Sequence, residues 1–270
     1  MHAASREAMQ AVQRRFDEVI GDVSDTSGFA AELASFGGLL IQHPVLRKYL
    51  AARSDDPAPK VAMVENLLSG KVSGPMVEVS KTAVAQRWSV TRDLAEAFER
   101  LGRLAILVGA ERDDQIENVE DELFRFGRTL DANPRLASLI SQVEQPLEGR
   151  IGLLDNVLGG KPTSFTTDLL RQTVRLLNGR NIVDVVPELA ELAAERRGES
   201  VAHVVAATPL SEEQHDRLAA VLSRIYGRTI SVQVDVDPDV VGGLRITVGD
   251  EVIDGTVVSR LERAASHLPE

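Results

Sequence analysis

Apolar side chains recur at helical spacing through most of the first 197 residues. Two stripes of this kind are Leu169, Leu170, Val174 and Leu177, and Leu136, Leu139, Ile140 and Val143. Residues spaced in this way share one face of a helix, and that face packs onto a core. Pro44 and Pro134 suit the first turn of a helix, where a missing N–H costs little, while Gly70 and Gly159–Gly160 suit the ends of helices. The pattern therefore predicts a mainly helical chain over this range.

This helical region repeats itself. The stretch HPVLRKYL from His43 corresponds to NPRLASLI from Asn133, and KVAMVENLLSGK (60–71) corresponds to RIGLLDNVLGGK (150–161). Pro44 matches Pro134 and Lys71 matches Lys161, both at an offset of 90 positions and without a gap. A register kept over this length indicates two tandem copies of one unit. We expect a first helical bundle over residues 1–103 and a second over residues 104–197.

The last part of the chain, residues 198–270, has a different pattern. The stretch SVAHVVAAT is rich in strand-forming residues, and TISVQVDV alternates apolar and polar positions, as a half-buried strand does. Between them, Ser211 and Gln214 have the spacing of a capping box at the start of a helix. The stripe that this helix would bury is Leu218, Val221, Leu222 and Ile225. We expect a small α/β domain in the order β-α-β-β-α.

The C-terminal stretch GGLRITVGDEVIDGTVVSRLERAASHL raises the question of a phosphate or metal loop, because it is rich in glycine and acid. A structural role accounts for the same residues. Gly249–Asp250 fits a hairpin turn, since both residues tolerate positive φ. Asp254 fits the N-cap of a last helix with Val258, Leu261, Ala265 and Leu268 on one face. We therefore interpret the glycines as turn residues and the acids as turn and cap residues.

Composition narrows the possible functions. The net charge is −11 with a pI near 5.0, so the surface repels phosphate backbones and anionic lipid headgroups, and we expect no nucleic-acid partner. The chain has no cysteine, which excludes disulfides and thiolate chemistry. No apolar run approaches the length of about 20 residues that a membrane-spanning helix needs, so we expect no direct membrane insertion.

Several chemical motifs are present only in part. GGKPTS (159–164) has Asp155 and Pro162 where a phosphate-binding loop needs glycine and Ser or Thr. DVDPDV (235–240) lacks the glycine and glutamate of a calcium loop. The histidines form no metal-binding pair. We therefore expect no catalytic residue, no cofactor and no metal. The acid-rich stretch 111–122 is interpreted as a solvated helix face, with a docking surface for a basic partner as the alternative.

The C-terminal stretch resembles the signature of the delta subunit family of F-type ATP synthases, whose mitochondrial counterpart is the oligomycin-sensitivity-conferring subunit. The residues that match are Gly243, Gly249, Asp250, Ile253, Asp254, Gly255, Arg260 and Leu261. LLRQTVRLLNGRNIVDVVPELAELAAERRGE and ATPLSEEQHDRL, further upstream, also fit, so the resemblance covers about residues 104–270. Thr256 stands where serine is commoner in that family. The first copy makes this chain similar to a long form with the helical domain duplicated.

The resemblance implies a helical bundle followed by a small α/β domain, and a protein that is not an enzyme. It implies a peripheral-stalk subunit at the cytoplasmic side of the cell membrane, as part of a proton-translocating ATP synthase. In that family the helical domain holds N-terminal helices of the alpha subunits, and the C-terminal domain holds the C-terminal end of the b subunit. Two alternatives stay open on the residues alone: a helical-repeat interaction adaptor unrelated to ATP synthase, and an enzyme whose acidic site is scattered along the sequence.

Overall fold

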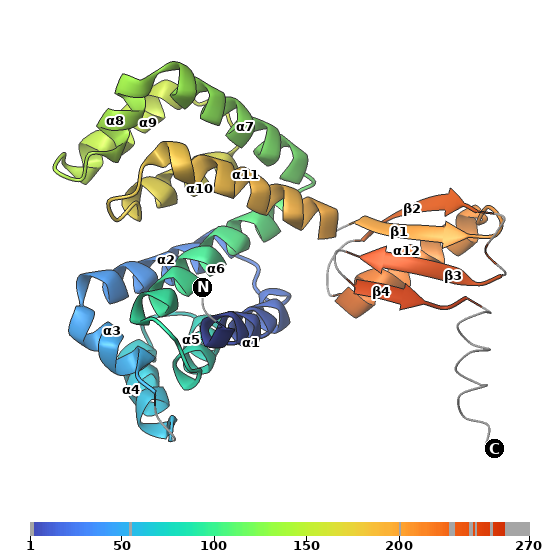
Figure 1. The fold of residues 1–270 in the computed structure, drawn as a ribbon, viewed down its shortest axis with the longest axis horizontal. Helices are drawn as coiled ribbons and strands as arrows, with labels where there is room; N and C mark the ends of the chain where they lie inside the picture. The colour runs from blue at the N-terminus through green and yellow to red at the C-terminus, as the bar shows by residue number, and fades with distance from the viewer. Residues whose placement is uncertain are drawn as a thin grey trace. The chain divides into compact units, whose positions relative to one another are not determined.

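The computed structural model of the chain describes residues 3–53, 56–199, 201–226, 230–237, 240, 242–248 and 251–256 (Figure 1). Contacts divide it into two units, Met1–Ala193 and Ala194–Glu270. The first unit is helical and the second carries a small sheet, so the expected fold class, mainly α with a small α/β C-terminal domain, is confirmed. Among the described residues, no helix is both long enough and apolar enough to span a membrane.

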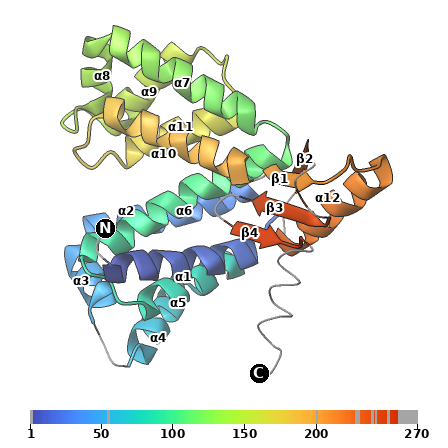
Figure 2. The ribbon, with the colours of Figure 1, turned by 45° about the vertical axis from the view of Figure 1, so that its right-hand side comes forward.

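The helices of residues 3–199 follow one another with short connections, and the last of them runs past the boundary of the first unit at Ala193 (Figures 1 and 2). They are α1 (Ala3–Ile20), α2 (Thr26–Gln42), α3 (Pro44–Ala51), α4 (Ala58–Leu68), α5 (Gly74–Ala85), α6 (Thr91–Arg112), α7 (Ile116–Ala132), α8 (Pro134–Ser141), α9 (Leu147–Leu158), α10 (Ser164–Arg175) and α11 (Ile182–Glu199). Pro44 and Pro134 begin their helices, as expected. Gly159 ends α9 with a φ of 58°, and Gly70 follows α4 with a φ of 72°. These glycines terminate helices, as expected.

The helices repeat at the offset of 90 positions that the sequence shows. Helices α2, α3, α4 and α5 correspond to α7, α8, α9 and α10. The same offset places α1 over α6 and α6 over α11, so α6 is both the last helix of the first copy and the first helix of the second. The division expected between residues 103 and 104 falls in the middle of this continuous helix. The two copies therefore share an element, and residues 1–193 group as one unit.

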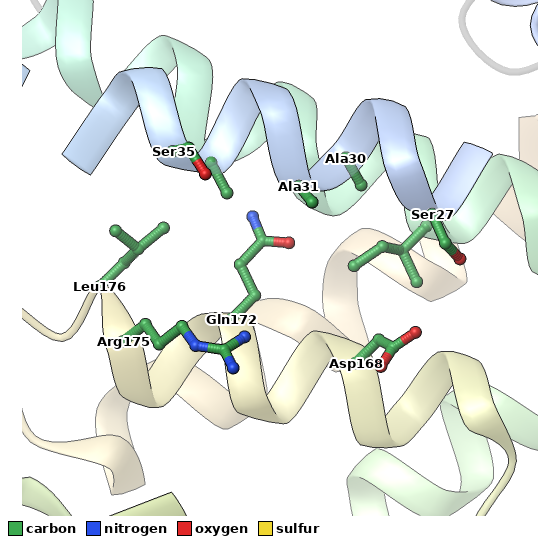
Figure 3. Close-up of a pocket in the computed structure, with 10 residues that line it drawn as sticks. Ser27, Ala30, Ala31, Ser35, Asp168, Gln172, Arg175 and Leu176 are labelled. Atoms are coloured by element: carbon green, nitrogen blue, oxygen red, sulfur yellow. The ribbon is translucent and has the colours of Figure 1, made fainter. Parts of the chain in front are cut away.

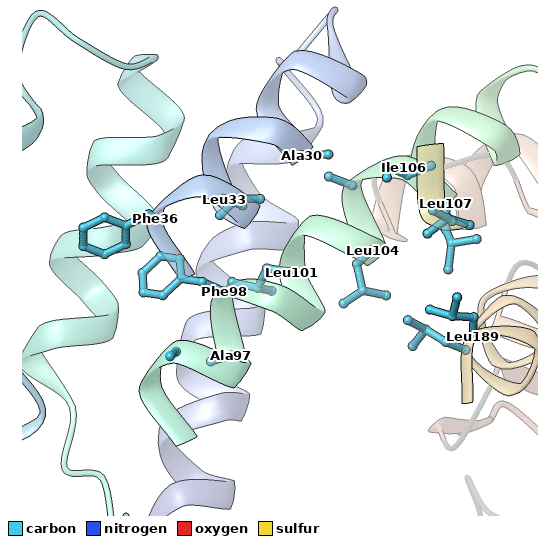
Figure 4. Close-up of a cluster of buried hydrophobic side chains, with 14 of the residues drawn as sticks. Ala30, Leu33, Phe36, Ala97, Phe98, Leu101, Leu104, Ile106, Leu107 and Leu189 are labelled. Atoms are coloured by element: carbon cyan, nitrogen blue, oxygen red, sulfur yellow. The ribbon is translucent and has the colours of Figure 1, made fainter. Parts of the chain in front are cut away.

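Helix α6 is buried on nearly all sides because both copies pack against it. Figure 4 shows Leu33 and Phe36 of α2 beside Phe98 and Leu101 of α6, with Leu189 of α11 near Leu107 further along the same helix. Phe36 and Phe98 meet edge to face with ring centroids 4.8 Å apart. One continuous apolar core extends from Ala8 to Ala193. This core joins the two copies through α6.

Glycines allow α2 and α6 to approach closely. A Cβ at Gly102 would lie 2.6 Å from Gln172 Nε2 and 3.1 Å from the Ala30 carbonyl oxygen. A Cβ at Gly37 of α2 would lie 3.2 Å from the Ala95 carbonyl oxygen. Glycine in a helix interior costs about 0.5–1 kcal/mol relative to alanine. Close packing of α2 on α6 offsets that cost.

A buried basic side chain closes the end of the third helix in each copy. Lys60 Nζ donates to the Ala52 carbonyl at 2.9 Å and to the Leu50 carbonyl at 3.4 Å. Arg150, at the corresponding position, donates to the Ile140 carbonyl at 3.4 Å. Burial lowers the pKa of Lys60. Helix C-termini leave carbonyls without partners, so this pair has a structural role that both copies keep.

The second unit is a four-stranded sheet with one described helix. Its elements are β1 (Val201–Ala206), α12 (Glu212–Tyr226), β2 (Ser231–Val236), β3 (Leu244–Val248) and β4 (Glu251–Asp254). The strand order is β2-β1-β3-β4, with β1 parallel to β2 and the other neighbours antiparallel. Ala202 and Val204 of β1 pack with Leu222 of α12 in a core separate from that of the first unit. The expected order omitted β4 as a strand, and the expected last helix lies outside the described residues.

Two of the expected apolar stripes are only partly buried. On α12, Leu222 is 2% exposed, but Val221 is 38% and Ile225 is 63% exposed. Near α8, Ile140 is buried, whereas Val143 is 55% exposed. The expectation of a buried stripe was wrong for Val221 and Ile225, and Val143 does not join the core either, because a short bundle or a small sheet covers only part of a helical stripe. Leu169, Leu170, Val174 and Leu177 are all buried, as expected.

Candidate helix-binding groove

The described residues contain no group of three or more His, Cys, Asp or Glu side chains that could hold a metal ion. His215 bonds through Nε2 to the Val232 carbonyl at 3.0 Å, which ties α12 to β2. The hollows in the surface of the described residues include one between α2 and α10, one beside α9, and one in the second unit.

The first hollow is a groove between α2 and α10 with α6 at its base, here named the junction groove (Figure 3). Its volume is about 320 Å³. The lining residues are Ser27, Ala30, Ala31, Ala34, Ser35, Ile106, Asp168, Gln172, Arg175 and Leu176. Since α2 belongs to the first copy and α10 to the second, the duplication itself creates this groove.

The α2 wall of the junction groove is made of small residues. Ser27, Ala31 and Ser35 are exposed and recur at intervals of four, so they share one helix face. Their counterparts on α7 are Glu117, Asp121 and Arg125. Ala34 corresponds to Phe124, which is 61% exposed. This face of α2 in the first copy thus carries small side chains, whereas the corresponding face of α7 in the second copy carries mostly longer ones.

The α10 wall is polar. Figure 3 shows Gln172 and Leu176 extending from α10 toward α2, with Asp168 at the same end of the groove as Ser27. Gln172 is 6% exposed and donates to the Glu99 carbonyl at 3.5 Å. Burial raises the pKa of Asp168 above its ordinary value, against the lowering effect of Arg171 and Arg175. The groove therefore combines small apolar surface with a carboxylate and a guanidinium.

The acid-rich stretch 111–122 has a role that the sequence analysis missed. Glu122 Oε2 accepts hydrogen bonds from the hydroxyls of Thr163 at 2.9 Å and Thr166 at 2.6 Å, at the start of α10. In the first copy, Glu32 accepts from Ser73 N–H at 2.9 Å in the same way. The repeat offset could have revealed this pairing, because Glu32 matches Glu122 and Ser73 matches Thr163. Glu122 is therefore a structural acid and not part of a solvated face.

Two further hollows lie elsewhere on the described residues. One of about 250 Å³ lies beside α9 and includes Phe126, Val157 and Pro162. The other, of about 480 Å³, lies in the second unit between β3 and α12 and includes Leu210, Leu218 and Val221. The second hollow adjoins the exposed apolar residues of α12, so the small domain also presents an apolar surface.

The C-terminal signature residues that the structure describes lie at the β3–β4 hairpin. Gly243 has a φ of 83°, and a Cβ there would clash with the Gly255 carbonyl oxygen, so only glycine fits. Gly255 N–H donates to the Leu244 carbonyl at 2.9 Å, and Ile253 pairs with Ile246 across the ladder. Gly249, Asp250, Arg260 and Leu261 lie outside the described residues.

The two expected helix caps show local hydrogen bonds. Ser211 Oγ accepts from Gln214 N–H at 3.2 Å, and Gln214 Oε1 accepts from Ser211 N–H at 2.9 Å, which is the reciprocal geometry of a capping box. Asp254 Oδ1 accepts from Thr256 N–H at 2.9 Å and from its hydroxyl at 2.7 Å. The helix that Asp254 would cap lies outside the described residues, so its role stays a prediction.

The chain is similar to proteins of a known family. Residues 104–268 match the family model described as ATP synthase delta (OSCP) subunit. The chain belongs to the ATP synthase delta (OSCP) subunit family. The match begins inside α6 and covers the second copy and the small domain, so the first copy is an addition to the delta family architecture.

Curated relatives of this delta-family chain match all of it. Proteins named ATP synthase subunit b-delta from Mycobacterium sp. strains KMS and JLS are each 50% identical over 273 residues, which covers 100% of this chain and 61% of each relative. The chain thus spans about 61% of the length of these relatives. A solved structure titled "Cryo-EM structure of Toxoplasma gondii mitochondrial ATP synthase hexamer, composite model" matches with 22% identity, covering 62% of this chain and 96% of that one. Its TM-score of 0.31 is too low to support a structural argument.

Proposed function

We propose that this chain is the delta-type subunit of a proton-translocating F-type ATP synthase, where it acts as a non-catalytic part of the peripheral stalk. The observation that carries the proposal is the family match over residues 104–268, together with 50% identity along the whole chain to proteins named ATP synthase subunit b-delta. In this role the chain works at the cytoplasmic side of the cell membrane as a peripheral component.

A stalk subunit must hold the catalytic head against the torque of the rotor. Contacts between helices and grooves can provide such a hold through buried apolar area, without reactive chemistry. The continuous core through α6 supports this role, because a unit with one core resists deformation better than two loosely tethered bundles. The acidic surface, with net charge −11, favours protein partners over nucleic acid.

The partners that we propose are the N-terminal helices of the alpha subunits and the C-terminal end of the b subunit. The helical unit would take the alpha helices, and the junction groove supports this because it has two helical walls and a helical floor. The small domain would take the b subunit, which the apolar surface around Leu218 and Val221 supports. The name b-delta of the relatives also fits an association with b.

The test is binding to the catalytic head of a mycobacterial ATP synthase that has been purified without its b-delta subunit. The full chain should co-migrate with this head in size-exclusion chromatography, and the purified chain alone should not hydrolyse ATP. An adaptor unrelated to ATP synthase would not bind the head. Failure to bind, or ATP turnover by the chain alone, would contradict the proposal.

A further inference from the structure

The two copies provide an internal comparison for the charges near the junction groove. In the first copy, Glu78 on α5 accepts a hydrogen bond from Arg15 of α1 at 3.0 Å and another from Lys81 at 3.2 Å. These hydrogen bonds hold the pKa of Glu78 below its usual value. Glu78 is therefore neutralised within the chain.

The second copy keeps the acid and loses its partner. Glu78 corresponds to Asp168, so the acid is kept. Arg15 corresponds to Ala105, whose side chain is uncharged and cannot pair with Asp168. Lys81 corresponds to Arg171, but Arg171 pairs with Asp155 through two hydrogen bonds of 2.9 and 3.0 Å. Within the part of the chain that the structure describes, Asp168 makes no hydrogen bond and no ion pair. A half-buried carboxylate in the groove thus has no salt-bridge partner, although the charges of Arg171 and Arg175 act on it from a greater distance.

The same position faces the small-residue wall. Asp168 and Gln172 lie across the groove from the face of α2 that carries Ser27, Ala31 and Ser35. The segment from Ser27 to Ser35 rises about 12 Å along the helix, or roughly two turns. A groove of this length with helices on both sides matches two turns of a third helix. Side chains as small as these let its backbone come close.

We propose that the junction groove receives an α-helix of a partner subunit, and that a lysine or arginine on the buried face of that helix pairs with Asp168. The rest of the buried face would carry small or apolar side chains against α2. The inference rests on the proposed function, and it specifies the chemistry by which that site selects its helix. The partner's cation takes the place that Arg15 fills in the first copy.

The test measures the affinity of the full chain for the catalytic head purified without its b-delta subunit, by surface plasmon resonance at low and high salt. Asp168→Asn should weaken binding about tenfold, and Asp168→Arg by more, because like charges then oppose each other in the groove. The salt dependence of binding should fall in Asp168→Asn. Glu78→Gln is the matched control, because Glu78 is already paired within the chain, and it should bind as the wild type does.

A second pair of variants tests the groove by shape. Ala31→Trp should block the groove and reduce binding at least tenfold, while Asp121→Trp at the corresponding exposed position of α7 should leave it unchanged. Both sites are exposed, so circular dichroism should show both variants folded. Cross-linking from a photoreactive residue at Ser35 should then attach to a helical segment that carries a lysine or arginine.

The outcomes separate the inference from the function on which it rests. If the wild-type chain binds the head but Asp168→Asn and Ala31→Trp bind equally well, the groove is not the site and the inference is wrong, although the stalk role stands. If Arg175→Gln weakens binding and Asp168→Asn does not, the partner helix presents an acid to Arg175 and the inference is also wrong. If the wild-type chain does not bind the head, both proposals fail.

Discussion

Glu122 on α7 holds the first turn of α10 through Thr163. Its two carboxylate oxygens lie 3.0 and 3.1 Å from the Thr163 nitrogen, and Oε2 accepts from the Thr163 hydroxyl at 2.9 Å. The first N–H groups of a helix have no partner inside the helix, and a carboxylate at this end also meets the positive end of the helix dipole. This contact ties two helices that are far apart in the sequence, and Glu32 repeats it at Ser73 in the first copy.

Replacement of Glu122 tests how much this contact stabilises the fold. Glu122→Ala should lower the free energy of unfolding of the helical unit by about 1–3 kcal/mol, because it leaves polar groups at the start of α10 without partners. Asp131→Ala, at an exposed position on the same helix, should change it by less than about 0.5 kcal/mol. Urea denaturation followed by circular dichroism gives both values. Equal midpoints for the two variants would contradict the role of Glu122.

The sequence predicted the elements that depend on local pattern. The helices, the two prolines at helix starts and the glycines at helix ends follow from periodicity and backbone preference, and the structure has them. The shared use of α6 leaves a trace in the sequence, because the continuous apolar run 104–110 suits a helix that is buried on nearly all sides. The run does not say which helices pack against it. The fold class and the family followed from local and repeated motifs, whereas the extent of each bundle needed the structure.

The junction groove could not be predicted from the sequence, because it depends on contacts between distant helices. Ser27, Ala31 and Ser35 carry no chemical signal until α10 is placed opposite them. The repeat does show that Arg15 of the first copy corresponds to Ala105 of the second. It does not show which acid Arg15 contacts. The charge run 111–122 predicts a solvated face for Glu122, because runs of charged residues are usually solvated. Long-range contacts decide these roles, and one sequence does not specify them.

The shared helix predicts where the chain can be cut. A fragment of residues 104–270 begins in the middle of α6 and loses Leu94, Phe98 and Leu101 from the core, each of which is fully buried. A fragment of residues 91–270 keeps the whole helix. The shorter fragment should show less helix by circular dichroism and no cooperative thermal transition of its helical part, while the helical part of the longer one should melt cooperatively. Equal melting of the two fragments would show that the first half of α6 belongs to the first copy alone.

Gly102 predicts a response that depends on packing and not on helix propensity. Gly102→Val should destabilise the helical unit by about 1–3 kcal/mol, because its side chain would meet Gln172 and the Ala30 carbonyl. Gly149→Ala on α9 is the control, since a Cβ there meets nothing within 4 Å. It should stabilise the unit by about 0.5–1 kcal/mol through helix propensity. Opposite shifts in the thermal midpoint are expected, and a stabilised Gly102→Val would disprove the close approach of α2.

Asp168 and Glu78 predict opposite effects of pH on stability. Burial raises the pKa of Asp168 in the folded chain, so its ionised form is disfavoured there. Relative to Asp168→Asn, the wild type should be equally stable below pH 3.8, the ordinary pKa of Asp, and should lose stability as the pH rises through the raised pKa. Glu78 has a lowered pKa, chiefly through hydrogen bonds from Arg15 and Lys81, so its ionised form stabilises the fold.

The wild type should therefore exceed Glu78→Gln in stability above pH 4.5, and that advantage should vanish as the pH falls through the lowered pKa of Glu78. Denaturation midpoints measured from pH 3 to pH 7 would give the two differences as functions of pH. Differences of the same sign would mean that the two acids have similar surroundings, and the comparison between the copies would then lose its basis.

Asp254 gives the last prediction, and it concerns the family signature. Its side chain accepts the N–H of Thr256 two positions later, as an N-cap residue does for the second residue of a helix. Asp254→Ala should lower the free energy of unfolding of the small domain by roughly 0.5–2 kcal/mol, and Asp254→Asn should retain most of it, because the amide oxygen can accept the same hydrogen bond. Amide hydrogen exchange of the full chain, read at residues 201–256, separates this domain from the helical unit. If Asp254→Ala left exchange in that range unchanged, Asp254 would be only a strand-end residue, and its place in the signature would need another explanation.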